Sequence, residues 1–195
     1  MKYLVFDVGG SAIKYALMND VYELLEKDSV PTPLDALDSF KKAIHDIYVK
    51  YQDEVEGIAI SLPGMINKKT NKMQIPGFLL YNDGVDIEAE LKSVTTNQLT
   101  IANDAKCAAI AEVGYGALQG VEDAIVIILG TGIGGCLIKD GKVYNGKHFS
   151  SGEVSSLHMN VHHPIGETYN WWRISGILGL REIAQRYLET DEELS

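Results

Sequence analysis

The sequence predicts an α/β protein made of two units that begin in the same way. Each unit opens with a short apolar strand, at residues 3–7 and 124–129, and each of these strands ends in a glycine-rich turn. In both places the residues after the turn look like another strand, and no helix is expected there. The prediction therefore rests on a strand, a glycine turn and a second strand, repeated once along the chain.

The first unit is expected to continue as a mixed sheet with helices. Strands are predicted at about residues 3–7, 12–18, 21–27, 57–61 and 99–101. Apolar residues recur at helical spacing over residues 34–52, which indicates an amphipathic helix. The strand at 57–61 ends in a Leu62-Pro63-Gly64 turn, and residues 65–85 look like a loop or hairpin excursion. A short helix at 87–91 and an alanine-rich helix from Asp104 to about Leu118 complete this unit.

The second unit repeats the opening and then diverges. A strand, an Asp140-Gly141 turn and another strand are expected after the second glycine turn, because Asp-Gly is a strong hairpin signal. A last helix ends near Leu188, and its apolar face is expected to need a partner. We place the boundary so that residues 1–118 form the first domain and residues 119–195 the second.

Both glycine turns have the composition of phosphate-binding loops. Adjacent glycines permit positive φ angles and let peptide N–H groups approach phosphate oxygens without an intervening Cβ. Hydroxyl groups at Ser11 and Thr131 could add donors, and Lys14 could add a positive charge whose direction depends on the strand pleat. The second turn has the glycine spacing of a dinucleotide-binding motif, but that motif needs a helix directly after it. The alternative that both turns are only tight hairpins stays open.

Asn103 and Asp104 stand between the two turns, where a strand gives way to a helix. Either residue could simply cap the helix, since both types are favoured there. A carboxylate at the end of a strand, near phosphate loops, could instead orient an acceptor hydroxyl and take its proton. We expect the helix N-terminus to lower the pKa of Asp104 and keep it ionised.

The overall composition excludes some classes of function. The formal net charge of −10, from 17 basic and 27 acidic residues, argues against broad binding to nucleic acids or anionic membranes. No apolar run approaches the ~20 residues that cross a bilayer, and we expect no signal peptide because Met1-Lys2 leads directly into a predicted strand. Two cysteines without a pairing pattern suit a reducing, cytoplasmic environment.

Taken in order, the motifs resemble those of the ROK family (repressors, open reading frames, sugar kinases) in the actin-like ATPase superfamily. The motifs that carry the resemblance are Asp7-Val8-Gly9-Gly10-Ser11, Leu62-Pro63-Gly64, Asn103-Asp104-Ala105, the turn at 130–135 and Ser151-Gly152-Glu153. The resemblance implies an actin-like (ribonuclease H-like) two-lobed ATPase fold. It also implies transfer of the γ-phosphate of ATP, with Mg²⁺, to a hydroxyl of a hexose or hexose derivative of the glucose, β-glucoside or N-acetylhexosamine type.

The resemblance also assigns roles to single residues. Asp104 would be the catalytic base, and Asp7 would act near the magnesium ion through water. The sugar would be bound by Gly64, Asn103, Asp104 and Glu153. The phosphates would be bound by Asp7, Gly9, Gly10, Ser11 and Lys14 from one lobe and by Gly130, Thr131 and Gly132 from the other. For Glu153, composition alone would favour a solvated loop carboxylate.

The sequence also departs from the family pattern. Val154-Ser155-Ser156-Leu157-His158 stands where Gly-His usually follows Glu153, and residues 159–180 contain no cysteine, so we expect no structural zinc. We expect His158, His162 and His163 to be surface or loop histidines. Trp171 or Trp172 could stack on a sugar, although such a pair more often belongs to a core or interface.

The chain is also shorter than family kinases, so the second lobe is expected to be incomplete. Two hypotheses stay open: an ATP-dependent sugar kinase that acts in the cytoplasm as a homodimer, and a non-catalytic sugar sensor or degenerate kinase. A DNA-binding repressor of the same family is not expected, because strand one starts at residue 3 without a preceding helix-turn-helix.

Overall fold

A computed structural model describes residues 1–160, 162 and 169–188 of the chain. The chain divides into two compact units, Met1–Cys107 and Ala108–Ser195. The division falls within helix α3 (Asp104–Tyr115), whereas the lobe boundary expected from the sequence lies just beyond the other end of that helix.

Unit 1 contains a five-stranded sheet with the order β3-β2-β1-β4-β7. Its strands are β1 (Lys2–Val8), β2 (Ala12–Asn19), β3 (Leu24–Pro31), β4 (Gly57–Leu62) and β7 (Gln98–Asn103). Strands β1, β2 and β3 pair antiparallel, whereas β1 pairs parallel with β4, and β4 pairs parallel with β7. The carboxyl ends of β1, β4 and β7 therefore meet at one edge of the sheet, where ligands commonly bind in α/β proteins.

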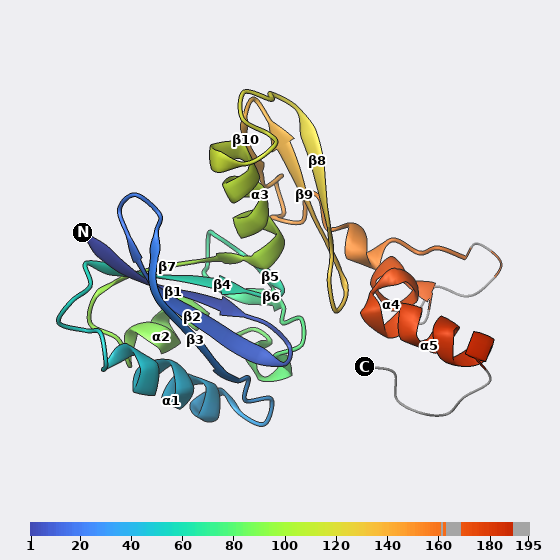
Figure 1. Ribbon diagram of the computed structural model, residues 1–195. Helices are drawn as coiled ribbons and strands as arrows, with labels where there is room; N and C mark the ends of the chain where they lie inside the picture. The colour runs from blue at the N-terminus through green and yellow to red at the C-terminus, as the bar shows by residue number, and fades with distance from the viewer. Residues whose placement is uncertain (161, 163–168, 189–195) are drawn as a thin grey trace. The chain divides into compact units, whose positions relative to one another are not determined.

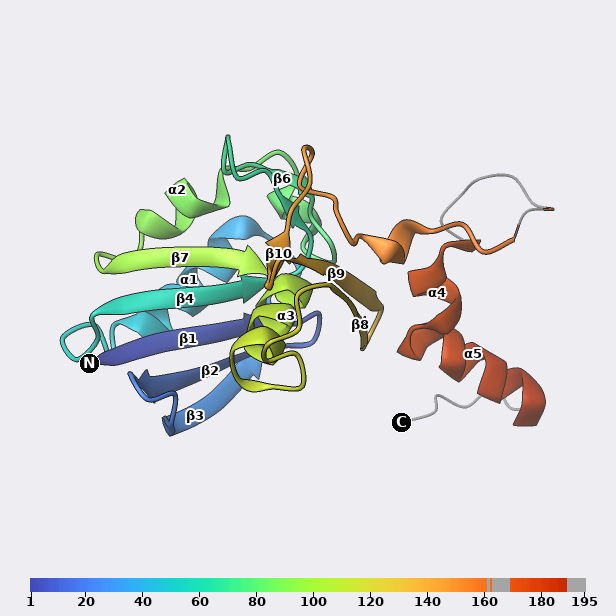
Figure 2. The ribbon, with the colours of Figure 1, turned by 90° about the horizontal axis from the view of Figure 1, so that it is seen from above.

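Helices α1 (Leu37–Tyr48) and α2 (Ile87–Lys92) pack on one face of this sheet (Figures 1 and 2). Helix α1 buries Phe40 and Ile44 against a core that includes Leu4 and Phe6 of β1. Alternate residues of β1 are buried, as expected of a strand with one face on the core. The helical spacing recognised in the sequence is thus the core-facing side of α1, although the helix is shorter than the predicted 34–52.

Strand β3 begins three residues later than the sequence predicted. The side chain of Asn19 accepts hydrogen bonds from the N–H groups of Val21 and Glu23, at 3.1 and 2.9 Å. Tyr22, within this turn, has a φ of 66°. The turn therefore occupies residues that the sequence assigned to the strand, because Asn19 offers the backbone an alternative to sheet pairing. The excursion predicted at 65–85 contains a small hairpin, β5 (Met65–Ile66) and β6 (Met73–Ile75), and a 3₁₀ turn η1 (Leu80–Asn82).

Unit 2 contains a three-stranded antiparallel sheet with the order β10-β9-β8. The strands are β8 (Ala124–Leu129), β9 (Ile133–Lys139) and β10 (Lys142–Tyr144). Asp140 and Gly141 join β9 to β10 with φ angles of 52° and 70°, which confirms the predicted Asp-Gly hairpin turn. Ala109 and Val113 of α3 pack with Cys136 and Ile138 in a small core.

The rest of unit 2 is formed by η2 (Val154–Ser156), α4 (Trp171–Ser175) and α5 (Ile177–Leu188). Trp171 and Trp172 of α4 are half-buried. Leu180, Ile183 and Tyr187 of α5 are exposed, on the helix that the sequence predicted to carry an apolar face.

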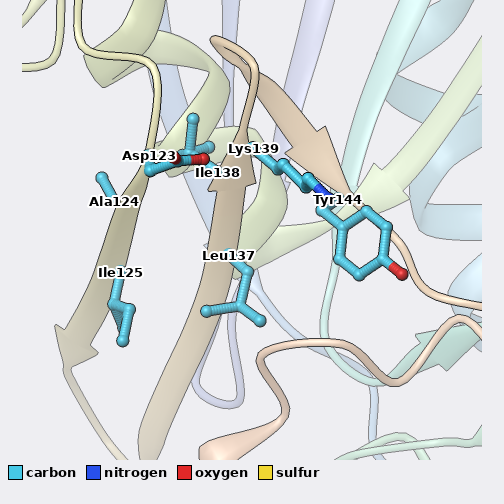
Figure 3. A pocket seen from close by; sticks show the side chains of 7 residues that line it. All are labelled: Asp123, Ala124, Ile125, Leu137, Ile138, Lys139 and Tyr144. Carbon is cyan, nitrogen blue, oxygen red and sulfur yellow. The ribbon is translucent and has the colours of Figure 1, made fainter.

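A shallow groove lies on the three-stranded sheet of unit 2 (Figure 3). Its walls are Asp123, Ala124, Ile125, Leu137, Ile138, Lys139 and Tyr144. None of the site residues expected from the sequence lines this groove. Among the helices that the structure describes, none combines the length and the apolar character that crossing a bilayer requires.

Candidate functional site

The first glycine turn joins β1 to β2 at the carboxyl edge of the unit 1 sheet. The N–H of Gly9 donates to the carbonyl of Ala12 at 2.9 Å and closes the turn. Neither Gly9 nor Gly10 has a φ in the left-handed region, so the expectation of positive φ angles was wrong. Space explains the glycine at position 10, because a Cβ there would lie 3.3 Å from the ring of Phe78. Glycine at position 10 therefore lets the ring of Phe78 pack closely against the turn.

Lys14, Asp7 and Ser61 lie side by side across three neighbouring strands. Asp7 of β1 is paired in register with Lys14 of β2 and with Ser61 of β4. Residues directly opposite each other on paired strands share one face of the sheet, so Lys14 has the same face as Asp7. The hydroxyl of Ser61 donates to Oδ1 of Asp7 at 3.2 Å. Asp7 and Lys14 are both exposed, and both remain accessible to a charged ligand.

Asn103 connects the end of β7 to the turn that follows β4. Its Oδ1 accepts a hydrogen bond from the N–H of Lys106 at 3.0 Å, so Asn103 caps α3. Its Nδ2 donates to the carbonyl of Gly64 and to Oδ1 of Asp104, both at 2.8 Å. One side chain therefore caps the helix, fixes the turn and orients the carboxylate of Asp104.

Gly64 occupies a position that only glycine can fill comfortably. Its φ is 95°, and an added Cβ would collide with the carbonyl of Ile75 and lie 2.9 Å from the carbonyl carbon of Pro76. The Leu62-Pro63-Gly64 turn thus packs directly against the backbone that leads out of β6. The carbonyl of Gly64 is held by Asn103, which brings this turn beside the start of α3.

Asp104 has a pKa above the ordinary aspartate value, which overturns the expectation that the helix N-terminus would lower it. The largest cause is desolvation by the protein atoms around the carboxylate, even though the side chain still reaches solvent. Hydrogen bonding by the N–H of Ala105, at 2.8 Å from Oδ1, opposes this effect. The negative charge of Asp7 raises the pKa further, and the amide of Asn103 lowers it. A raised pKa makes Asp104 a better proton acceptor than an ordinary surface aspartate.

Cys107 lies in the same cluster and was not predicted as part of it. Burial raises the pKa of its thiol, a hydrogen bond with Ser61 opposes this, and the charges of Asp104 and Asp7 raise it further. Ser61 therefore contacts both Asp7 and Cys107. Two features of the sequence could have placed these residues in the cluster. Ser61 stands just before the 62–64 turn, and Cys107 stands one helical turn after Asp104.

The second glycine turn joins β8 to β9 and is held by the start of α5. The N–H of Gly130 donates to the carbonyl of Gly132 at 2.9 Å, and the carbonyl of Gly130 accepts from the N–H of Ile177 at 3.1 Å. A Cβ at Gly176 would lie 2.7 Å from the carbonyl oxygen of Thr131. The junction between α4 and α5 therefore packs on the backbone of this turn, while Thr131 itself is exposed.

Glu153 is half-buried in unit 2, and its Oε1 is buried, which does not fit a solvated loop carboxylate. Gly152, the residue before it, has a φ of 82° and lies where a Cβ would be 2.7 Å from Cα of Cys136. In turn, a Cβ at Gly135 would collide with the carbonyl of Gly152. Close contact between these two glycines places Glu153 beside the strand that leads out of the second glycine turn.

The histidines do not all behave as the sequence predicted. His158 is half-buried with a buried Nδ1, and its ring lies 6.0 Å from that of Tyr169 in an edge-on arrangement. These contacts show that His158 is packed against the protein. Its backbone also forms a β-bridge with that of Asn170. His162 is exposed, as expected. His163, and with it part of the segment that would follow as a zinc loop, lies outside the described residues.

The structure brings all of the site residues predicted in unit 1 to one sheet edge: Asp7, Gly9, Gly10, Ser11, Lys14, Gly64, Asn103 and Asp104. Gly130, Thr131, Gly132 and Glu153 lie in unit 2, close to β9. Comparison with known proteins shows which family has this combination of residues. The ROK family profile matches residues 3–170 of the chain. The chain belongs to the ROK family.

Two of the relatives that this ROK protein matches are named as sugar kinases. It is 33% identical over 165 residues to the N-acetyl-D-glucosamine kinase of Vibrio parahaemolyticus, covering 82% of this chain and 53% of the relative. It is 31% identical over 157 residues to the beta-glucoside kinase of Listeria monocytogenes, covering 80% and 53%. The ROK chain thus spans about half the length of the curated relatives it matches.

A solved structure shows the same fold. The Lmo2764 protein of Listeria monocytogenes superposes with a TM-score of 0.86 at 28% identity, covering 100% of this chain and 67% of that one. The actin-like α/β fold predicted from the motifs is therefore confirmed, with part of the relatives' length outside the match.

Proposed function

We propose that this ROK protein is an ATP-dependent kinase that phosphorylates a hydroxyl of a hexose or hexose derivative. The observation that carries the proposal is the carboxylate of Asp104, which is oriented by Asn103 and raised in pKa at the carboxyl edge of the sheet. Asp7 and the first glycine turn lie at the end of β1, which β4 separates from β7, at the same edge of the sheet. Relatives named as sugar kinases support the reaction type.

In this proposal, Asp104 accepts the proton of the acceptor hydroxyl. The sugar oxygen then forms a bond to the γ-phosphorus, the bond between that phosphorus and the bridging oxygen breaks, and ADP leaves. The amide of Asn103 and the N–H of Ala105 hold Oδ1 of Asp104, so the orientation of the carboxylate is set before the sugar arrives. General-base catalysis of this kind contributes about 10²–10⁴-fold to the rate.

The glycine turns and the basic side chain are proposed to bind the phosphates. Peptide N–H groups at Gly10 and Ser11 would act in unit 1, together with the exposed ammonium of Lys14, while the N–H of Gly9 closes the turn. Gly130, Thr131 and Gly132 would contribute from unit 2. Phosphoryl transfer depends mainly on positioning and electrostatic stabilisation, and rigid backbone turns supply both.

Magnesium fits the donors that unit 1 presents. Mg²⁺ usually binds through one or two carboxylates, water and substrate phosphates. Asp7 offers one exposed carboxylate on the face that also carries Lys14. Among the described residues there is no group of three or more His, Cys, Asp or Glu side chains that could hold a metal ion. Bound at Asp7 through water, Mg²⁺ would neutralise phosphate charge.

The sugar is proposed to contact Gly64, Asn103, Asp104 and Glu153. Glu153 is half-buried next to β9, as a specific ligand carboxylate would be. The relatives' names favour N-acetylhexosamines and β-glucosides as the first sugars to test. A cytoplasmic homodimer, expected from the sequence, stays part of this proposal, and analytical ultracentrifugation tests the dimer.

The test is a coupled ADP-release assay with ATP, Mg²⁺ and a panel of N-acetyl-D-glucosamine, N-acetyl-D-mannosamine, glucose and β-glucosides. Asp104→Ala is expected to lower kcat by at least 100-fold. Asp38→Asn, which changes an exposed carboxylate in the first turn of α1, is the matched control and leaves kcat unchanged. Turnover that survives Asp104→Ala would refute the proposed role of this residue.

Calorimetry separates this function from that of a non-catalytic sensor. A kinase binds both a sugar and ATP, whereas a sensor binds a sugar and shows no heat of ATP binding. Sugar binding without any ADP release would replace the kinase proposal by the sensor.

A further inference from the structure

Thr32 contacts the first glycine turn at two points from outside the motif. It directly follows β3 and is only 8% exposed. Its hydroxyl donates to the carbonyl of Gly9 at 2.7 Å, and its backbone N–H donates to the carbonyl of Ser11 at 3.1 Å. Because these two carbonyls flank Gly10, one buried residue holds the turn on both sides of its centre.

The contacts of Thr32 determine which way the N–H groups of the turn point. The peptide unit is planar and trans, so its C=O and N–H groups point in opposite directions. When the carbonyl of Gly9 points at Thr32, the N–H of Gly10 must point away from it. The same geometry directs the N–H of Ala12 away from Thr32, because this N–H shares a peptide unit with the carbonyl of Ser11.

Phe78 restrains the same turn by packing. Its ring lies against Gly10 so closely that a Cβ at position 10 would be 3.3 Å from Cδ2 and 3.4 Å from Cγ. Phe78 follows Gly77, whose backbone packs on Pro63 and Gly64. The peptide between Gly9 and Gly10 is therefore fixed at its carbonyl by Thr32, and the residue after it is limited by Phe78.

We propose that Thr32 is a positioning residue that holds the first glycine turn in the conformation that binds the phosphates of ATP. It acts through the Gly9–Gly10 peptide, whose N–H it aims outward, and makes no contact with the nucleotide itself. This inference rests on the proposed kinase function, because that function places the phosphates at this turn. Removing the hydroxyl leaves the Gly9 carbonyl without its donor, and the peptide is then free to rotate.

The test compares three variants. Thr32→Val removes the hydroxyl at nearly constant volume, and Thr32→Ser keeps it. Thr95→Val is the matched control, because Thr95 is also buried and its hydroxyl also donates to a backbone carbonyl, that of Leu91 at 2.9 Å. Thr95 lies just beyond α2.

Two measurements are made on each variant. Calorimetry gives the dissociation constants of ATP and of the sugar, and hydrogen exchange gives the protection of residues 8–12 in the free protein. Thr32→Val is expected to weaken ATP binding about fivefold, the factor for a net hydrogen-bond contribution of about 1 kcal/mol, with the sugar constant unchanged. It should also speed exchange in residues 8–12, while Thr32→Ser and Thr95→Val match the wild type in both measurements.

The outcomes separate this inference from the proposed function. If the unmodified protein binds no ATP, the kinase proposal fails. The inference about phosphate positioning then fails with it, whatever the hydrogen-exchange measurement shows. If the unmodified protein binds ATP and Thr32→Val binds it equally well, the positioning role is overturned while the kinase proposal stands. If Thr32→Val weakens the binding of sugar and of ATP equally, or if Thr95→Val weakens ATP binding as much as Thr32→Val does, the cause is a general loss of stability. Either result would also overturn the positioning role of Thr32.

Discussion

Replacing Asn103 with alanine tests the link between helix capping and the proposed active site. Asn103 makes three hydrogen bonds, to the N–H of Lys106, the carbonyl of Gly64 and the carboxylate of Asp104, and is 7% exposed. The substitution removes all three at once. We expect it to destabilise the protein and to change the environment of Asp104.

The structure sets the size of the effect on stability. Loss of a helix N-cap costs about 1 kcal/mol. Loss of the donor to the Gly64 carbonyl costs about 1–3 kcal/mol more, because a half-buried acceptor loses its partner. Asn103→Ala should therefore lower the free energy of unfolding by about 2–4 kcal/mol. Asn103→Ser keeps a capping oxygen but not the amide donor, so it should recover only about 1 kcal/mol.

Urea denaturation followed by far-UV circular dichroism measures these differences, and the shift of the midpoint is used where the slope is unchanged. Asp86→Ala is the matched control, because Asp86 caps α2 through the N–H of Ala89 at 3.0 Å. This control should cost only about 1 kcal/mol and leave kcat unchanged. If Asn103→Ala and Asp86→Ala lose the same stability, the contact with Gly64 contributes nothing and the reasoning is refuted.

Two further predictions concern charge and space. Because the folded pKa of Asp104 is raised, the folded state binds its proton more tightly than the unfolded state, so ionised Asp104 lowers stability at neutral pH. Asp104→Asn should unfold at higher urea than wild type at pH 7, and the gain should disappear near pH 3, below the ordinary aspartate pKa of about 3.9; no gain at pH 7 would contradict the raised pKa. Gly176→Ala should weaken ATP binding by crowding Thr131, whereas Gly114→Ala, at a helical position with open space, should bind ATP normally; calorimetry of the two variants decides.

Much of the fold was predictable because its signals are local. The apolar spacing of α1, the Asp140-Gly141 turn and the strand after each glycine turn depend on residues that are neighbours in the sequence. The start of β3 was missed because the side chain of Asn19 competes with sheet pairing. Such competition depends on backbone geometry that the sequence pattern does not display.

The structure agrees with the sequence in placing Asn103 and Asp104 together, and it differs on the direction of the pKa shift of Asp104. Asn103 and Asp104 were expected together, yet only the structure shows that Asn103 is the helix cap, leaving the carboxylate of Asp104 at the sheet edge. The pKa of Asp104 was expected to fall because the helix N-terminus was the one visible influence. Desolvation and the charge of Asp7 depend on contacts across the sheet, and they reverse the direction.

The packing of the glycine motifs also depends on contacts that the sequence does not reveal. Gly10 and Gly135 were expected to permit unusual φ angles, but they provide space, for the ring of Phe78 and for the carbonyl of Gly152. Each turn is also held by residues distant in sequence, Thr32 in unit 1 and Ile177 in unit 2. A motif therefore identifies where a phosphate could bind, whereas the contacts that make the turn rigid have to be found in the structure.

The proposed base and the residues around it lie within one unit of the chain. Asp7, Ser61, Asn103 and Asp104 belong to three neighbouring strands and the first turn of α3, and all precede residue 108. Their orientation depends on sheet register and on hydrogen bonds inside unit 1. The proposed base is thus preorganised by unit 1 itself, and mutations in unit 2 should alter ATP binding while leaving the pKa of Asp104 as it is. A titration of Asp104 in Gly176→Ala that moved with the loss of ATP affinity would show that this separation is wrong.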